Sequence, residues 1–219
     1  MVTSTSAVQQ PTVIDGATSL EHILAEATSA LDAAQVDYVV FGGVASSALG
    51  RPRTTRDVDI LLRPESARMA LRLLDDHGFE TDQLDDKWIF KAQKGSVVVD
   101  LIFATRYGIH LDSAMLAHAQ KASFAGVSFT CIGREDLLII KAVACDEASP
   151  RHWFDALGLI IGGPMDWGYL LERSNRASRR VLSLLLYAQS IDYFVPRAIT
   201  HRLIELCDEP SDVPSLPVE

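Results

Sequence analysis

The chain has 219 residues, of which 48% are hydrophobic and 22% charged, and its 20 basic and 29 acidic residues give a formal net charge of −9. This hydrophobic content excludes a largely disordered chain. The longest apolar runs fall short of the roughly 18 residues that a membrane-spanning helix requires, so no membrane partner is expected. The acidic charge disfavours a protein that binds nucleic acid over most of its surface.

The N-terminus and the cysteines predict a cytoplasmic protein. Residues 1–10 have no basic segment followed by an apolar core, so no secretory signal is predicted. The three cysteines, Cys131, Cys145 and Cys207, are an odd number at wide spacing in apolar surroundings. This pattern favours buried thiols over disulfides or a zinc site.

The first half of the chain alternates between helical and extended patterns. Residues 1–17 read as a flexible tail, and Thr18-Ser19-Leu20-Glu21 is a capping box that starts a helix to about Gln35. Two β-branched runs, 36–41 and 58–62, predict strands, and Gly42-Gly43 ends the first of them.

Further elements follow up to Gly133. Pro64 is a favourable first residue for a helix that stops at Gly78. The runs 88–92 and 97–104, separated by Lys94-Gly95, predict two antiparallel strands joined by a tight turn. The run 124–132 predicts one more strand.

Beyond Gly133 the strand signal disappears, and helical spacing predicts three or four helices up to Cys207. The fold class expected is therefore α/β (α+β), a domain over 18–133 with a mixed sheet flanked by helices, followed by a helical bundle over 134–207. Residues 208–219 hold three prolines and four acidic residues without a basic one, and are expected to form an acidic tail.

Two features of the first half predict phosphate and metal chemistry. Gly42 and Gly43 directly follow a strand and leave backbone N–H groups bare at the start of the next helix, which favours an anionic phosphate. Side chains alternate along a strand, so Asp57 and Asp59 point to the same side. Paired carboxylates repel each other unless a cation lies between them, and Mg²⁺ prefers oxygen ligands.

Asp100 is the candidate for a third carboxylate. It is the only charged residue in the apolar run Val97–Phe103. A polar residue of an edge strand that faces water is the alternative interpretation. The pair Asp57 and Asp59 favours the metal interpretation.

These motifs together resemble the nucleotidyltransferase superfamily of DNA polymerase β. The stretch Gly42-Gly43-Val44-Ala45, with Arg53-Thr54-Thr55-Arg56-Asp57-Val58-Asp59, is similar to the minimal nucleotidyltransferases that include AbiEii-type toxins of toxin–antitoxin pairs. The resemblance covers roughly residues 36–200. It implies that 18–133 is the nucleotidyltransferase catalytic domain, and for a toxin it implies an antitoxin partner.

The resemblance also implies roles for residues of the second half. The segment 133–141 resembles a family helix that ends in a lysine reaching the triphosphate, a role that falls to Lys141. Family members usually carry Lys/Arg-Asp-x-x-Asp next, and this chain has Arg151-His152-Trp153-Phe154-Asp155. Asp155 matches the second acid of that segment, whereas His152 replaces the first.

The activity implied is transfer of a nucleoside monophosphate from an NTP such as ATP to an acceptor, with release of pyrophosphate. Asp57 and Asp59 would clamp two Mg²⁺ ions about 3.5–4 Å apart, with Asp100 as a further ligand or the base for the acceptor hydroxyl. Gly42 and Gly43 would hold phosphates. The acceptor is left open between tRNA, protein and a small hydroxylated molecule.

Arginines surround the predicted acidic site. Residues 51–72 contain six arginines and three acidic residues, which favours a polyanion nearby, although ion pairs on a solvated helix face explain the pattern equally well. Among them Arg56 is the one we expect near the nucleotide. A second cluster, Arg173, Arg176, Arg179 and Arg180, fits either contact with acceptor RNA or helix capping.

Two classes of function remain at this point. An enzyme accounts for the complete set of three carboxylates, because unpaired charges kept close together are costly without a use. A non-catalytic nucleotide-binding or regulatory module that retains the fold is the alternative, and it is motivated by His152 at a position where an acid is expected.

Overall fold

The structure, a computed structural model, describes residues 19–85, 87–105 and 108–208. The predicted N-terminal tail, residues 1–17, and the predicted acidic tail beyond Asp208 lie outside these residues. Within the described part, no helix combines the length and the hydropathy needed to cross a bilayer.

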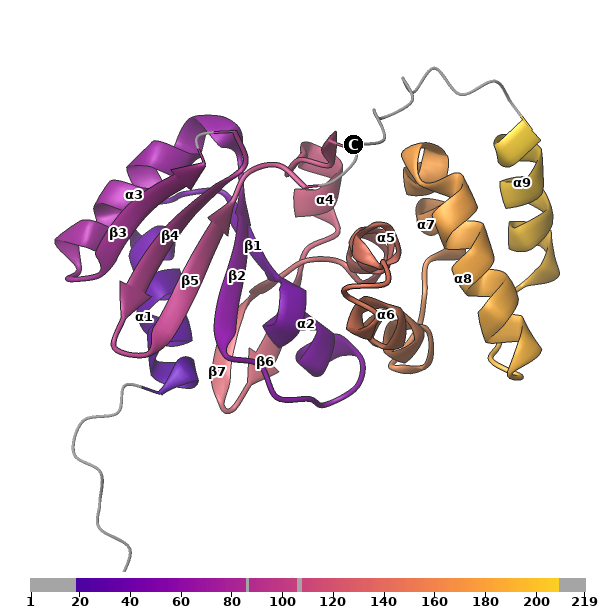
Figure 1. The fold of residues 1–219 in the computed structure, drawn as a ribbon, viewed down its shortest axis with the longest axis horizontal. Coiled ribbons are helices and arrows are strands. Elements are labelled where there is room, and N and C mark those ends of the chain that lie inside the picture. The colour runs from indigo at the N-terminus through magenta and orange to yellow at the C-terminus, as the bar shows by residue number, and fades with distance from the viewer. Residues whose placement is uncertain (1–18, 86, 106–107, 209–219) are drawn as a thin grey trace, which may run out of the picture.

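A single seven-stranded mixed sheet forms the centre of the fold, with the strand order β3-β4-β5-β2-β1-β7-β6 (Figure 1). Strand β2 runs parallel to β5 and antiparallel to β1, and β1 runs parallel to β7. The predicted α/β class with a mixed sheet and flanking helices is confirmed. The strands are β1 Tyr38–Phe41, β2 Asp57–Leu62, β3 Glu80–Asp85, β4 Ile89–Lys94, β5 Val97–Ile102, β6 Gln120–Phe124 and β7 Val127–Cys131.

Helices cover both faces of the sheet. Helices α1 and α3 contact each other and the strands on one face, whereas α2, α5 and α6 form a contiguous group against the other. Helices α8 and α9 lie farthest from the sheet (Figure 1). The α-helices are α1 Leu20–Ala33, α2 Gly42–Leu49, α3 Ala67–Asp76, α4 Ser113–Ala117, α5 Arg134–Ala144, α6 Arg151–Ile161, α7 Trp167–Arg173, α8 Ser178–Ser190 and α9 Arg197–Asp208.

The helix starts follow local signals. Ser19, rather than the predicted Thr18, caps α1, and its hydroxyl accepts a hydrogen bond from the His22 N–H at 3.4 Å; Thr18 lies outside the described residues. Pro64 does begin a helical segment, but its first three residues form a 3₁₀ turn before α3. Five α-helices, α5 to α9, follow Gly133, where three or four were expected.

Two strand predictions need correction. The run 124–132 is not one strand, because Ala125 and Gly126 adopt positive φ angles of 47° and 85° and turn the chain between β6 and β7. Strand β3 was not predicted at all. It is a mostly exposed edge strand of hydrophilic sequence, so it lacks the alternation of apolar residues by which strands are recognised.

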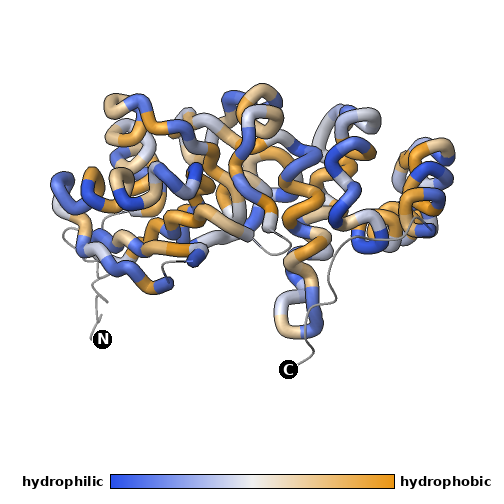
Figure 2. The backbone as a smooth tube through the Cα atoms, turned by 90° about the horizontal axis from the view of Figure 1, so that it is seen from above, coloured by the Kyte–Doolittle hydropathy of each residue, from blue (hydrophilic) through white to orange (hydrophobic). Residues whose placement is uncertain are grey.

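The core is continuous from the sheet into the helices. Val58 and Ile60 of β2 are fully buried, as are Leu137 of α5 and Leu184 of α8, and all belong to one hydrophobic cluster. Apolar stretches run through the central strands, and hydrophilic residues mark the turns and outer helical faces (Figure 2). Cys131 is buried as predicted, and Cys145 and Cys207 are half-buried free thiols.

A buried arginine joins three of the helices. Arg134, the first residue of α5, donates through Nη1 to the carbonyl oxygens of Leu49 at 2.5 Å and Leu159 at 2.8 Å. These carbonyls belong to the last turns of α2 and α6, where backbone acceptors otherwise lack partners. Arg134 therefore fixes the ends of both helices to the start of α5.

Candidate active site

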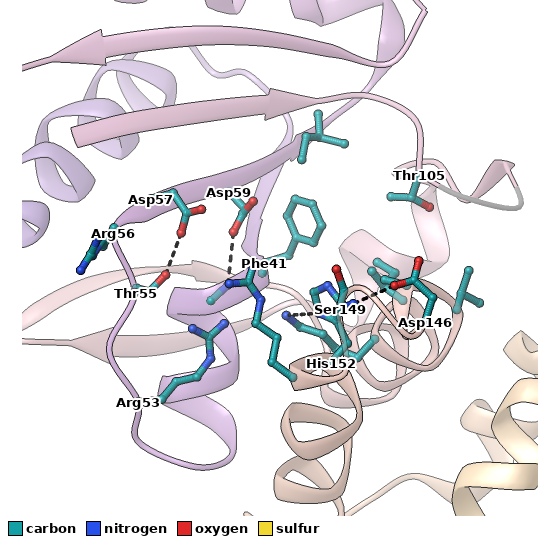
Figure 3. A pocket seen from close by; sticks show the side chains of 18 of the residues that line it. Phe41, Arg53, Thr55, Arg56, Asp57, Asp59, Thr105, Asp146, Ser149 and His152 are labelled. Carbon is teal, nitrogen blue, oxygen red and sulfur yellow. Dashed lines mark hydrogen bonds between the residues drawn. The ribbon is translucent and has the colours of Figure 1, made fainter. Parts of the chain in front are cut away.

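Three carboxylates meet at the centre of the sheet. Asp57 and Asp59 lie on β2, and Asp100 lies opposite Asp59 on the parallel neighbour β5. One oxygen of each carboxylate can be chosen so that all three lie within 4.8 Å of one another. Figure 3 shows Asp57 and Asp59 side by side on one face of β2.

The alternation of side chains along β2 creates this arrangement, as the sequence predicts. Val58 and Ile60 are fully buried, whereas Asp57 and Asp59 are partly exposed on the other face. Asp100 does not lie on an edge strand, because β5 is flanked by β4 and β2. The alternative interpretation of Asp100 as an edge-strand residue is therefore wrong.

Each carboxylate is held by one neighbour. The Thr55 hydroxyl donates to Asp57 Oδ1 at 2.8 Å, and the Gly43 N–H donates to Asp59 Oδ2 at 3.2 Å (Figure 3). Lys91 of β4 donates through Nζ to Asp100 Oδ1 at 2.6 Å. These contacts orient the carboxylates toward one another.

The electrostatics of the cluster suit a bound cation. Burial, followed by repulsion from Asp57, raises the pKa of Asp59 to about 6. A divalent ion with oxygen ligands would offset this repulsion. The three carboxylates therefore fit Mg²⁺, with Asp57, Asp59 and Asp100 as the residues that would hold it.

Gly42 and Gly43 permit the close approach of α2 to the acids. Gly42 has a φ of +62°, and a Cβ at this position would lie 1.8 Å from Asp59 Oδ2. A Cβ on Gly43 would lie 2.3 Å from the Thr55 hydroxyl oxygen. Only glycine fits at either position, so the predicted Gly-Gly turn serves the packing around the carboxylates and also lines the pocket.

A buried ion network faces the carboxylates from the helices. Arg53, in the loop before β2, makes a bidentate contact with Asp155 of α6, with distances of 3.0 Å from Nε to Oδ1 and 3.2 Å from Nη2 to Oδ2. Lys141 Nζ of α5 lies 2.9 Å from Asp155 Oδ2. Burial lowers the pKa of Lys141, and Asp155 opposes that effect. Asp155 thus stabilises the charged form of the lysine.

His152 adjoins this network. Its Nδ1 lies 3.4 Å from Lys141 Nζ, and burial, together with the positive charge of Lys141, lowers the pKa of His152 to about 4. The imidazole is therefore neutral at pH 7 and can accept a hydrogen bond from the lysine. It occupies the expected acidic position without adding a negative charge.

The carboxylates and the network open into one pocket of about 980 Å³. One side is polar and includes Gly42, Asp59 and Lys141; the other carries apolar residues from the end of β5 and from α5. In Figure 3, Ser149 and His152 face the acids from the opposite wall. The apolar or aromatic lining residues beyond the acids are Trp88, Ile102, Ala104, Ile140, Val143 and Ala144.

The remaining predicted residues take different places. Arg56 is exposed at the pocket wall, whereas Arg53 reaches the ion network; sequence spacing does not distinguish the two. Asp155 lies behind Lys141 rather than in the pocket lining. Arg173 is bound by Asp136 and Asp112, and Arg179 and Arg180 each donate to a backbone carbonyl.

The family model that matches residues 20–192 is described as "Nucleotidyl transferase of unknown function", and it spans both the sheet and the helices that complete the pocket. The chain belongs to this family of nucleotidyl transferases. The match confirms the predicted enzyme class. It does not distinguish an AbiEii-type toxin from other members, so that finer resemblance stays a prediction.

Solved structures of similar fold support the nucleotidyl transferase architecture. The solution structure of the antibiotic-resistance factor ANT(2'')-Ia is 18% identical, with a TM-score of 0.52, and the match covers 80% of this chain and 94% of that one. Lincomycin-bound lincosamide adenylyltransferase LnuA is 16% identical, with a TM-score of 0.47 over 66% of this chain and 96% of that one. No curated protein matches the chain.

Proposed function

We propose that this nucleotidyl transferase moves a nucleoside monophosphate from an NTP to a small hydroxylated acceptor. The observation that carries the proposal is the meeting of Asp57, Asp59 and Asp100 opposite Lys141 within one pocket. Carboxylates that bind a divalent ion, facing a cation that binds phosphate, are what in-line transfer of a nucleotide requires.

Each side of the pocket has a task in this reaction. The backbone of Gly42 and Gly43, at the positive end of α2, and the ammonium of Lys141 would hold the β and γ phosphates. Mg²⁺, when bound by the three aspartates, supplies charge neutralisation at the phosphates and acidifies the acceptor hydroxyl. Asp155 keeps Lys141 charged and in place.

The transfer step balances as follows. The acceptor oxygen forms a bond to the α-phosphorus as the bond from that phosphorus to the β-phosphate bridging oxygen breaks, and pyrophosphate leaves. Asp100 takes the proton of the acceptor hydroxyl on its carboxylate. Asp57 and Asp59 hold the reacting centre between the strands and α2.

Two observations favour a small acceptor over RNA. The volume of about 980 Å³ lies at the upper end of the range for small-molecule sites, and part of its wall is apolar. Three of the four arginines in the cluster at 173–180, a candidate RNA surface, are engaged by protein acceptors. ANT(2'')-Ia, the neighbour of similar fold, is an antibiotic-resistance factor, and small-molecule modification is consistent with that likeness.

The test is to incubate purified protein with each α-labelled NTP, Mg²⁺ and a cell extract fractionated into RNA, protein and small molecules. Wild type is expected to label the small-molecule fraction and to release pyrophosphate, and Asp59→Asn to label nothing. Label in RNA or in protein would retain the chemistry but overturn the acceptor class, as for a toxin. NTP binding without label in any fraction would favour the non-catalytic module.

A further inference from the structure

A lysine lies in line with the candidate metal ligands. The strand register places Lys91 of β4 opposite Asp100 of β5, and Asp100 opposite Asp59 of β2. Directly opposed residues point to the same face of a sheet, so these three side chains form a row across three adjacent strands. The row ends in the ion pair of Lys91 Nζ with Asp100 Oδ1 at 2.6 Å.

The environment makes this ion pair stronger than an ordinary surface pair. The Asp100 side chain is 15% exposed and that of Lys91 36%. Water screens such a pair only in part. Lys91 therefore neutralises one of three carboxylates at short range.

The other nearby cation is engaged elsewhere. Lys141 influences Asp59 through space, but its own ion pair is with Asp155. Within residues 19–85, 87–105 and 108–208, the ion pair of Lys91 with Asp100 is the direct one that a cation makes with the cluster.

We infer that Lys91 is a built-in counter-ion that lowers the affinity of the carboxylate cluster for divalent metal ions. This inference rests on the proposed function, because it takes the three aspartates as the metal ligands. Lys91 occupies Oδ1 of Asp100 and places a positive charge beside the site, so a second cation binds there against electrostatic repulsion. Lys91 is a positioning residue, since it acts on the metal through Asp100.

The test measures binding of Mn²⁺ alone, without nucleotide, by electron paramagnetic resonance. Lys91→Met retains the apolar stem and removes the charge, and is expected to lower the Kd for Mn²⁺ by about tenfold. Lys91→Arg keeps the charge and is expected to retain the wild-type Kd. Lys91→Gln serves the same purpose as the methionine variant if that variant is poorly folded.

Lys94→Met is the matched control. Lys94 belongs to the same strand, and its ion pair is with Glu26 of α1, at 2.5 Å from Nζ to Oε1. It changes the net charge equally, so it reports the long-range effect of losing one cation. A Kd for Lys91→Met equal to or above that of Lys94→Met would overturn the inference.

One further variant separates this inference from the proposed function. If Asp59→Asn binds Mn²⁺ as tightly as wild type, the ion is bound elsewhere and the proposed metal site is wrong. If Asp59→Asn loses binding while Lys91→Met and Lys94→Met have the same Kd, the metal site stands and the role of Lys91 alone fails.

Discussion

Asp155 Oδ2 lies 2.9 Å from Lys141 Nζ, and the same carboxylate receives the guanidinium of Arg53 from a loop 102 residues earlier in the sequence. The Asp155 and Lys141 side chains are only 6% and 4% exposed. A carboxylate shared by two cations in this setting holds the loop before β2, α5 and α6 together.

Asp155→Asn is expected to lower the free energy of unfolding by about 3 kcal/mol, because it leaves a buried lysine without its counter-ion. Chemical denaturation at pH 7 measures the change. Asp37→Asn is the matched control, since Asp37 pairs with Arg63 but is 57% exposed, and its effect should stay within about 1 kcal/mol. Equal losses for the two variants would contradict the structural role of Asp155.

Asp59→Asn is expected to stabilise the metal-free protein while it abolishes transfer. The pKa of Asp59 is raised from 3.8 to about 6, so its ionisation above pH 6 costs the folded state stability that the unfolded state does not lose. In EDTA at pH 7.5 the variant should gain about 1 kcal/mol in the free energy of unfolding.

Asp82→Asn provides the comparison for this gain, because it removes the same charge from an exposed position on β3. Its stability should match wild type under the same conditions. A loss of stability in Asp59→Asn would show that the repulsion within the cluster is already relieved without metal.

His152→Gln is expected to reduce the loss of stability in weak acid. The pKa of His152 is lowered from 6.5 to about 4, so below pH 6.5 the unfolded chain takes up a proton that the folded protein resists. Stability conferred by the neutral imidazole is therefore present above pH 6.5 and is lost as the pH falls toward 4.

Thermal unfolding of wild type and His152→Gln at intervals between pH 7 and pH 4.5 measures this effect. The Tm of the wild type should fall more steeply than that of the variant over this window. Parallel curves would mean that His152 is protonated in the folded protein, and its neutral contact with Lys141 would then be wrong.

Gly43→Ala is expected to reduce transfer at least tenfold, because its Cβ would lie 2.3 Å from the Thr55 hydroxyl oxygen and 3.0 Å from Arg53 Nη2. The side chains that must move are the one that holds Asp57 and the one that binds Asp155. Overpacking of this kind costs about 1–3 kcal/mol of stability.

Gly168→Ala is the control for this substitution. Gly168 also lies in a helix, α7, but its added Cβ makes only an ordinary contact at 3.4 Å with Asp166 Oδ1. The variant should retain full transfer and gain up to about 1 kcal/mol, because alanine favours a helix. Full activity of Gly43→Ala would show that the turn tolerates a side chain.

The carboxylate cluster was predictable because its geometry follows from strand alternation and from one lone charge in an apolar strand. Lys91 was within reach of the same reasoning. A hairpin turned at Lys94-Gly95 pairs Lys94 with Val97, and counting back along both strands places Lys91 opposite Asp100. That register was the missing step.

Arg53 and β3 lay beyond what the sequence indicates. Arg53 is one of several arginines before β2, and its partner Asp155 comes from another helix, so only the packing of α6 against the loop selects it over Arg56. Strand β3 forms because β4 offers a free edge, and its exposed, hydrophilic residues carry no local pattern.

The hydrogen bonds of Arg134 have a consequence for motion. They join the last turns of α2 and α6 to the first residue of α5. Gly43, Lys141 and Asp155 are therefore carried by helices that shift as one body. Substrate entry and product release then require that this body move against the strands that bear the acids, or that the Arg53 loop open at its end.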